Sequence, residues 1–404
     1  MTGTATRALD VDRVRSWFPA LEQGVAWFDG PGGSQVPRPV AEAVAATLLA
    51  GVSNRGTVTA AERRADAVVT GAREAVADLV GADPGGVVFG RSMTQLTMDL
   101  ARALAREWGP GDEVVVTRLD HDADIRPWVL AAERAGATVR WADLDPATGE
   151  LALDPALIGE RTRLVALTGA SNLLGTRPDV PAVAAAAHAV GALVFVDGVH
   201  LTPHAPVDVA DLGADVYACS PYKFFGPHLG ALAADPALLD RVRPDKLLPS
   251  SDAVPERFEL GTLPYELLAG VTAAVDFIAD LAPGPGTGRR EQVLESMRAV
   301  EVWEEQLLAR LLDGLGSVGH VRLHGAPVRR TPTVLFSVDG RSGAQVHRAL
   351  AERDVYAPAG SFYALEASRR MGLGDEGAVR AGLAPYTSED DVDRLLAAVT
   401  DLAR

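Results

Sequence analysis

Two residues of this sequence have the chemistry and the spacing to work as a pair. Lys223 lies in a loop of small and aromatic residues at positions 219–228, and Asp197 closes the apolar run at positions 192–197. A lysine amine can hold pyridoxal phosphate (PLP) as a Schiff base, and a carboxylate at the end of a buried strand can pair with the pyridinium nitrogen of that cofactor. The two residues therefore predict a PLP site.

The composition limits the classes of protein to consider. A chain of 404 residues with 48% hydrophobic and 23% charged residues is ordinary for a globular enzyme with a large core. Its net charge of −16 argues against nucleic acid and against an anionic membrane surface as partners. Its single cysteine excludes an intrachain disulfide framework and Cys-rich metal sites. The N-terminal residues lack the apolar core of a signal peptide, and the longest apolar stretch, 183–196, is too short to span a bilayer, so we expect a cytoplasmic enzyme.

The elements that must position the lysine and the aspartate alternate along the chain. Helical spacing is found at 94–108, 125–135 and 180–190, between short apolar runs that predict strands at 86–89, 113–117, 138–141, 163–168, 192–197 and 215–218. This alternation predicts βαβ units and a mostly parallel sheet flanked by helices, whose ligands gather at the carboxyl ends of the strands.

The composition changes near the end of this alternating region. A Pro- and Gly-rich stretch at 282–288 predicts a linker or turn. A long helical stretch at 290–315, a strand around 333–338 and a final helix at 389–402 follow it. These elements predict a second, smaller α+β domain.

Three further segments follow predicted strands and could contribute to the same site. Ser92 and Gln95 have the spacing of a capping box, so that the free amides of the first helical turn and the Thr94 hydroxyl would suit a phosphate, although an ordinary capped helix would look the same. His121 could lie flat on a conjugated ring or shuttle protons, or could simply be solvated. No second histidine stands at ligand spacing beside it, so we expect no metal. Asn172 could bind a substrate carboxylate or the phenolic oxygen of the cofactor, or serve only in a turn.

Taken in order, these segments resemble the class V aminotransferase group of fold-type-I PLP enzymes, and within it the SufS-like cysteine desulfurases. The resemblance begins at about Trp27 and continues to the C-terminus. It is carried by the motifs at 27–37, 197–200, 220–223, 257–262 and 379–383.

The resemblance implies an α/β fold with a large domain and a smaller one. It implies an N-terminal arm at 1–25 that packs with the small domain, a large PLP-binding domain at 26–285 with a mostly parallel, seven-stranded-type sheet, and a small α+β domain at 286–404. It also implies a homodimer.

The resemblance further implies a role for each residue of the site. Lys223 binds PLP and moves protons, Asp197 keeps the ring nitrogen protonated, and His121 stacks on the ring. The other implied cofactor-binding residues are Met93 (through its amide), Thr94, Asn172, His200, Ser220, Tyr222 and, from a neighbouring subunit, Thr262. The implied substrate-binding residues are Asn172 and Arg380, for the amino acid's carboxylate, with Arg55 and Ser361.

The sequence differs from the resembling desulfurases at the cysteine on which their reaction depends. Those enzymes need a mobile cysteine in the small domain, but positions 355–364 contain none, and Cys219 is interpreted as a buried small hydrophobe. His200, Tyr222 and Asp124 stand where the desulfurases carry glutamine, histidine and asparagine.

These departures disfavour cysteine desulfuration. We therefore predict a PLP-dependent lyase that performs β-elimination, with C–S cleavage of a cysteine conjugate or a related amino acid, in a pocket shaped by Phe362 and Tyr363. An aminotransferase, a decarboxylating oxidative deaminase or an epimerase would use the same cofactor chemistry, and a PLP-binding protein without turnover is the alternative of another class.

Overall fold

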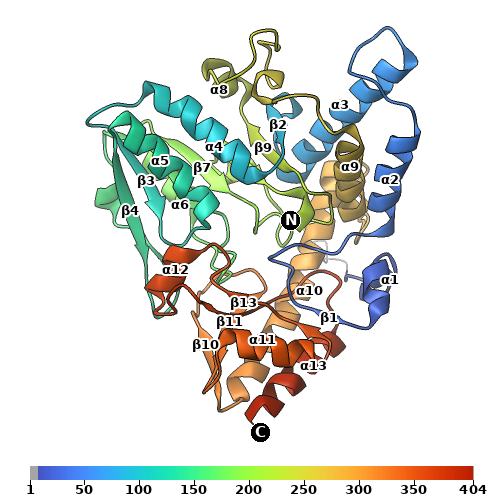
Figure 1. Cartoon of the computed structure of the whole chain (residues 1–404), viewed down its shortest axis with the longest axis vertical. Coiled ribbons are helices and arrows are strands. Elements are labelled where there is room, and N and C mark those ends of the chain that lie inside the picture. Colours follow the sequence, from blue (N-terminus) through green and yellow to red (C-terminus); the bar gives the residue numbers. More distant parts are fainter. Residues whose placement is uncertain (1–7, 404) are drawn as a thin grey trace.

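The structure, a computed structural model, describes residues 8–403. A large sheet with its helices forms the upper part of the molecule in Figure 1, and a smaller sheet with the C-terminal helices forms the lower part. The predicted α/β fold with a second α+β unit is confirmed. Within residues 8–403, no helix combines the length and the apolar character that crossing a bilayer requires.

The large sheet has eight strands in the order β2-β9-β8-β7-β6-β3-β4-β5. Their bounds are β2 (Val87–Gly90), β3 (Glu113–Thr117), β4 (Thr138–Leu144), β5 (Leu151–Ala152), β6 (Thr162–Thr168), β7 (Leu193–Asp197), β8 (Val216–Cys219) and β9 (Gly230–Ala234). The five strands from β8 to β4 in this order are mutually parallel, whereas β9 runs antiparallel to both neighbours and β5 pairs antiparallel with β4.

Every predicted strand of the large sheet is present, with bounds that differ by at most a few residues. Two strands were not predicted. β9 consists of glycine, alanine and leucine and has no β-branched residue, and β5 is only two residues long. Neither segment carries the pattern by which a strand is recognised in a sequence.

Helices cover both faces of this sheet. Val114 and Val116 of β3 pack with α4 (Met93–Leu104) and α5 (Arg126–Ala135), whereas Val115 faces the side of α3 (Ala60–Val80), α6 (Val180–Ala189) and α9 (Tyr265–Ala279). Successive strand residues point to opposite faces, so a strand covered on both sides must be apolar throughout. That constraint explains the continuous apolar runs of the sequence. The other helices of this part are α2 (Arg38–Leu49), α7 (Val209–Leu212) and α8 (Pro236–Arg241).

The lower part is built on an antiparallel sheet of four strands in the order β10-β11-β14-β13. Its strands are β10 (Val321–His324), β11 (Thr333–Val338), β13 (Ala359–Gly360) and β14 (Ala378–Gly382), and its helices are α11 (Gly343–Ala351), α12 (Leu365–Arg370) and α13 (Glu389–Thr400). Side chains of β11, β14, α11 and α13 share one hydrophobic cluster.

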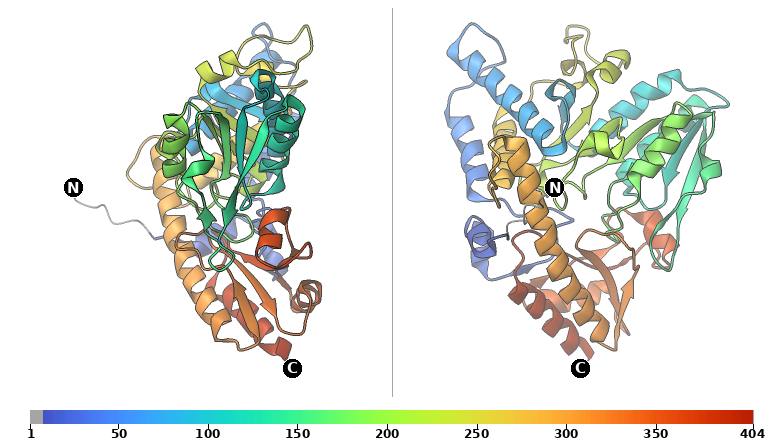
Figure 2. Two further views of the ribbon diagram at one scale, coloured as in Figure 1. Left: turned by 90° about the vertical axis from the view of Figure 1, so that its left-hand side faces the viewer. Right: turned by 180° about the vertical axis from the view of Figure 1, so that it is seen from behind.

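A single long helix, α10 (Arg289–Ser317), connects the two parts. Figure 2 shows it from behind, running from the level of the large sheet to the C-terminal helices. It contacts α3 and α9 in the upper part and α13 and β10 in the lower part. The division of the chain at 285 and 286 stays a prediction, since this helix packs on both sides of it.

The N-terminal segment contacts both parts as well. In α1 (Val11–Ser16), Arg15 donates to the backbone oxygen of Tyr386 and to Asp391, at 2.6 and 2.7 Å, next to or within α13, whereas Arg13 pairs with Asp280 of the large part at 3.0 Å. The short β1 (Ala26–Trp27) then pairs in parallel with β12 (Val355–Tyr356). Residues 1–7 of the predicted arm lie outside the described residues.

Candidate active site

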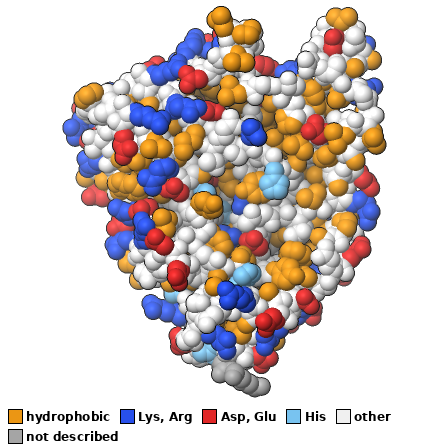
Figure 3. Space-filling model, in the orientation of Figure 1, with side chains coloured by type: hydrophobic (Ala, Val, Ile, Leu, Met, Phe, Trp, Pro, Cys, Tyr) orange, Lys and Arg blue, Asp and Glu red, His pale blue; other side chains and the backbone are white. Residues whose placement is uncertain are grey.

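A cavity of about 650 Å³ opens between the carboxyl edge of the large sheet and the lower part of the molecule. Figure 3 looks onto the same face as Figure 1, and histidine side chains (pale blue) lie between the two parts there. The cavity wall brings together many residues named from the sequence: Met93, Thr94, His121, Asn172, Asp197, His200, Ser220, Tyr222, Lys223 and Arg380.

Lys223 reaches the cavity from a 3₁₀ turn, η6 (Pro221–Lys223), directly after β8. Its Nζ donates to the backbone oxygen of Pro31. Burial, and after it the charge of Arg380, lowers the pKa of Lys223 to about 8. The amine is therefore neutral, and nucleophilic, at a lower pH than an exposed lysine.

Asp197 stands at the end of β7, where only 4% of its surface is exposed. Its Oδ1 accepts the backbone N–H of Val199 at 2.9 Å, and no donor to Oδ2 is found in residues 8–403. Burial raises the pKa of Asp197 to about 6, against the opposing effects of the Val199 N–H and of the Lys223 charge. A buried carboxylate with a free oxygen on a cavity wall fits a protonated ring nitrogen, which would supply the missing donor.

The start of α4 lies at the same wall. Ser92 Oγ accepts the N–H of Gln95 at 3.1 Å, but Gln95 Oε1 accepts from Arg91 at 3.0 Å and not from Ser92, so the predicted capping box is only half formed. The amides of Met93 and Thr94 have no acceptor among residues 8–403, and the buried Ser220 shares the cavity with them. Free amides at a helix N-terminus with a hydroxyl nearby fit a phosphate.

Strand β9 of the large sheet packs directly against the backbone of the turn before α4. A Cβ on Gly230 of β9 would lie 2.2 Å from the backbone carbon of Ser92 and 2.3 Å from the amide nitrogen of Met93. Only glycine leaves room for β9 directly beneath the turn.

His121 belongs to the cavity wall and is not a solvated loop residue. It precedes the turn η4 (Asp122–Asp124), and its Nδ1 accepts the N–H of Ala123 at 3.0 Å. Burial, and then the charge of Lys223, lowers the pKa of His121 to about 4, so that the ring is neutral and carries its proton on Nε2. Within the described residues, no group of three or more His, Cys, Asp or Glu side chains is arranged to hold a metal ion.

Arg380 and Asn172 meet beside the cavity although they come from different sheets. Arg380 is 2% exposed, and it donates to Asp29 Oδ1 at 2.8 Å and to the backbone oxygen of Asn172 at 3.0 Å. Asn172 Nδ2 donates to the backbone oxygen of Phe362 at 2.9 Å, while its buried Oδ1 has no donor within residues 8–403. The Asn172 amide thus uses one of its two N–H groups on Phe362, and its second N–H and its Oδ1 have no partner within residues 8–403.

The loop between β13 and α12 presents two aromatic side chains to the cavity. Phe362 and Tyr363 have φ of 51° and 60°, in the left-handed region that residues with a side chain rarely adopt. The Arg380 guanidinium lies 3.7 Å from the centre of the Phe362 ring, and Asp122 N–H donates to the backbone oxygen of Tyr363 at 2.8 Å. Contacts on both sides therefore hold this loop in its uncommon backbone conformation.

His200 and Tyr222 both line the cavity. His200 Nε2 lies 3.0 Å from the hydroxyls of Thr331 and Thr333, across the boundary between the two parts. Tyr222 stacks on His228, with ring centres 4.7 Å apart and an interplanar angle of 13°.

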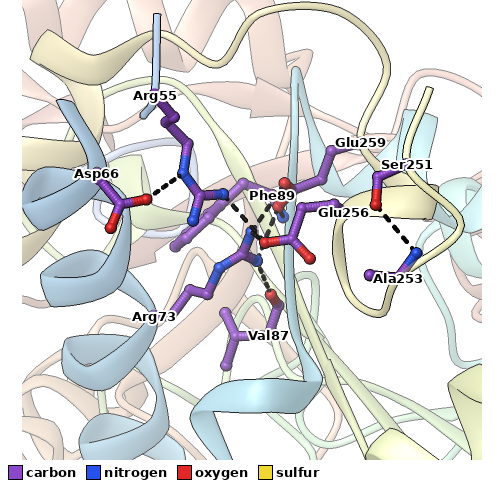
Figure 4. Close-up of polar contacts among 9 residues, drawn as sticks. All are labelled: Arg55, Asp66, Arg73, Val87, Phe89, Ser251, Ala253, Glu256 and Glu259. Atoms are coloured by element: carbon purple, nitrogen blue, oxygen red, sulfur yellow. Dashed lines mark hydrogen bonds and ion pairs between the residues drawn. The ribbon is translucent and has the colours of Figure 1, made fainter. Parts of the chain in front are cut away.

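Three residues predicted for the site lie elsewhere in the single chain. Arg55 pairs with Asp66 at 2.9 Å and with Glu256 at 3.0 Å, in the network of Figure 4, and so does not line the cavity. Thr262 is exposed on a loop after α8, and Ser361, which directly precedes Phe362, is half-buried and is not part of the cavity wall. The predicted contacts of these three residues with cofactor or substrate stay predictions.

Asp29 is a residue of the site to which the sequence assigned no role. It forms the ion pair of Arg380, from which it is separated by 351 positions. No local pattern announces the pair, because it depends on how β1 and the following turn lie against β14.

Comparison with known proteins identifies the family. The model of the class-V aminotransferase family matches residues 26–395. The chain belongs to this family. An uncharacterized protein of Mycobacterium tuberculosis is 38% identical to it over 400 residues, with 98% of this chain and 100% of the relative covered. An aminotransferase-like protein of Gibberella zeae is 31% identical, with 98% and 99% covered. The crystal structure of the cysteine desulfurase CsdA from Escherichia coli superposes with a TM-score of 0.86 at 27% identity, over 98% of this chain and 99% of that one.

Membership of the class-V aminotransferase family makes this chain a PLP-dependent enzyme of fold type I. The residues present fit the cofactor, since a partner-free carboxylate oxygen, free helix amides and a buried amine face one cavity. When bound, PLP supplies an electron sink for negative charge that develops on an amino acid. Asp197 would hold the ring nitrogen, Met93, Thr94 and Ser220 the phosphate, and Lys223 the carbonyl carbon.

The lowered pKa of Lys223 predicts how the cofactor should load. Because the neutral amine attacks the carbonyl, the rate at which PLP-free protein gains the visible absorbance of lysine-bound PLP should rise with pH and level off above about 8. Lys223→Ala should give no such absorbance. The chain has one other lysine, Lys246, so Lys246→Ala is the matched control and should keep the profile. A rate that rises until about pH 10, the range of an ordinary lysine, would contradict this interpretation.

Proposed function

We propose that this enzyme is a lyase that eliminates a β-substituent, such as a thiol, from an amino acid. The observation that carries the proposal is the character of the wall formed by Phe362 and Tyr363, which holds no thiol. The only cysteine of the sequence, Cys219, is 2% exposed, and burial raises the pKa of its thiol to about 12. A buried thiol that stays protonated cannot attack a substrate sulfur, which disfavours persulfide formation.

The remaining groups support chemistry at Cα. Lys223, with its pKa lowered to about 8, is suited to take a proton from Cα, and in this proposal Arg380 would receive the carboxylate. The electron pair of the broken C–H bond forms the Cα–Cβ double bond, and the substituent leaves Cβ with its own bonding pair. For a thioether, substrate plus one water then gives the thiol, pyruvate and ammonium.

The names of the relatives do not decide between reactions at the same cofactor. One is called aminotransferase-like and another is a cysteine desulfurase. Transamination, decarboxylation-linked oxidation and epimerisation are therefore outcomes that the assay must separate from elimination. The cytoplasmic setting expected from the sequence stays a prediction.

The assay should follow products from a panel of β-substituted amino acids, with cysteine S-conjugates and free L-cysteine included. We expect pyruvate and ammonium in equal amounts with a released thiol for at least one conjugate, and none from Lys223→Ala. Lys246→Ala should behave as the unaltered enzyme.

Other products would overturn the proposal in distinct ways. Alanine and sulfide from cysteine would show desulfuration, a 2-oxo acid with the intact side chain would show transamination, and the opposite enantiomer would show epimerisation. An absence of any product and of any spectral change with all substrates would favour a PLP-binding protein without turnover.

We further propose that Arg380 binds the carboxylate of the substrate, which would compete with Asp29 for the guanidinium. Arg380→Ala should weaken binding of the amino acid by on the order of 2–5 kcal/mol, because it removes a buried charge partner. Arg380→Lys keeps the charge but loses the planar guanidinium fork. Its affinity for the amino acid should lie between those of the unaltered enzyme and of Arg380→Ala. Titration of substrate against the cofactor spectrum measures both, and unchanged affinity in Arg380→Ala would refute the assignment.

We also propose a homodimer in which Thr262 completes the phosphate site of the partner subunit. Exposed apolar side chains lie near that loop and on the end of α2, namely Leu48, Leu49, Val58, Leu247, Leu248 and Leu260. The salt bridge from Arg55 to Glu256 joins the loop after α2 to the loop that precedes Thr262. A two-fold dimer would bury this surface, as closed symmetric assemblies of one chain usually do.

The proposed dimer predicts that Thr262 contributes to the affinity for PLP. Sedimentation velocity should show a dimer, and Thr262→Val should lower PLP affinity several-fold without changing the sedimentation coefficient, because it removes one hydroxyl from the phosphate. Thr272→Val is the matched control, since that hydroxyl only donates to its own helix at Leu268. A monomeric enzyme with full PLP affinity would exclude the shared site.

A further inference from the structure

Two buried carboxyl groups flank His121 and take no part in the chemistry above. Asp120 and Asp124 are both 0% exposed. One precedes the histidine, and the other closes the η4 turn that follows it. The proposed function leaves both carboxyl groups unexplained.

Each carboxyl is fixed at one oxygen by a neutral donor. Asp120 Oδ2 accepts the hydroxyl of Thr117, at the end of β3. Asp124 Oδ1 accepts the indole N–H of Trp128, a fully buried residue of α5, at 3.1 Å. The two side chains are therefore anchored to different elements on either side of the His121 turn.

The other two oxygens are buried, and besides Thr117 the backbone N–H of Thr168, at the end of β6, approaches the Asp120 carboxyl. Within residues 8–403, no hydrogen-bond partner is found for Asp120 Oδ1 or Asp124 Oδ2, and neither carboxyl forms an ion pair. Two ionised carboxylates in such a place would repel each other and lose their hydration without compensation. The two carboxyl groups lie within hydrogen-bonding reach of each other, so a proton between them would satisfy both at once, as in other carboxyl pairs that cannot both ionise.

We propose that Asp120 and Asp124 keep a proton between Asp120 Oδ1 and Asp124 Oδ2, and that this carboxyl pair positions His121 by closing the turn that carries it. The bond spans the turn from its first residue to its last. Within it, Asp124 N–H donates to the backbone oxygen of His121 at 2.8 Å, so movement of Asp124 would move the histidine. The pair is a positioning device and touches no substrate.

The electrostatic surroundings favour the protonated pair. Burial raises the pKa of Asp120 to about 8, and burial and then the charge of Asp120 raise the pKa of Asp124 well above its usual range. The charge of Asp197 raises the pKa of both. The titratable and charged groups around the turn are Asp197 on β7, Lys223 after β8, Arg380 on β14, Arg126 at the start of α5, and His121 and Asp122 in the turn itself.

The pair has a signature in the pH dependence of stability. An unfolded aspartate loses its proton near pH 4, whereas burial and the neighbouring carboxyl raise the pKa of the folded Asp124 well above that, so the folded state binds an extra proton above pH 4. Stability from this proton is complete below about pH 4 and is lost as the pH rises toward the raised pKa of the folded pair.

The variant Asp124→Asn removes the shared proton but keeps the shape and the hydrogen bonds of the pair. Its amide can donate to Asp120 Oδ1 and accept from Trp128 without any shared proton. The ratio of the unfolding constant of the holoenzyme to that of Asp124→Asn should therefore rise about tenfold per pH unit above pH 5, for as long as the folded pair keeps its proton. Urea titrations at a constant PLP concentration measure it.

Asp122→Asn is the matched control, because it makes the same change in the same turn. Its carboxylate is partly exposed and pairs with Arg126 at 3.1 Å, so the corresponding ratio should stay flat. A flat ratio for Asp124→Asn as well would refute the shared proton.

Infrared spectroscopy detects the proton directly and works if a variant fails to fold. The holoenzyme at pH 7, where an ordinary aspartate is ionised, should show the carbonyl band of a protonated carboxyl group, which shifts in D₂O. The band should be absent from Asp124→Asn and present in Asp122→Asn. Absence of such a band from the unaltered enzyme overturns the proposal.

The positioning of His121 has its own readout. The circular dichroism of bound PLP at pH 7 should be kept in Asp124→Asn, which preserves the bond, and lost in Asp124→Leu, which cannot make it. Equal spectra for the two variants would show that the pair does not position the histidine.

Discussion

The common edge at which parallel strands end is the constraint on which the rest of this structure depends. β3, β6, β7 and β8 run in one direction, so the residues that follow them meet at one edge of the sheet. Asp197 and Lys223 come together there because of this geometry, and both are buried because helices cover the sheet on its two faces. Burial disfavours charge on each of them, which brings the pKa of the acid up to about 6 and that of the amine down to about 8. The fold thus places the two groups and also adjusts their reactivity.

The second half of the site belongs to the smaller sheet. Arg380 enters from β14, contacts Asn172 of the large sheet and pairs with Asp29 near the N-terminus. This arginine therefore joins three segments that are distant in sequence. A substrate carboxylate that replaced Asp29 as the partner of Arg380 would change contacts in both parts of the molecule, because α10 and β1 also connect these parts.

The aromatic part of the cavity wall comes from the lower part of the molecule. Phe362 and Tyr363 occupy the loop between β13 and α12, and the backbone there is held in a left-handed conformation by Asn172 and Asp122. The carboxyl pair of Asp120 and Asp124 flanks His121 along the chain. A scaffold that retains its electron sink can change its reaction through such contacts, because PLP supports many bond cleavages and the protein selects among them by position.

The sequence by itself determined the alternation of strands and helices, the parallel sheet, and the prediction that Lys223 and Asp197 belong to one site. Apolar runs with an acid or a small-residue loop at their ends are local signals, and parallel strands bring such ends together. Only the tertiary structure decided the antiparallel β9, whose alanines carry no strand signal, and the ion pair of Asp29 with Arg380, which spans 351 positions. It alone showed that the Gln95 side chain turns to Arg91 and that Asn172 donates to Phe362. These choices depend on which acceptor lies nearest in space, and no spacing along the chain records that.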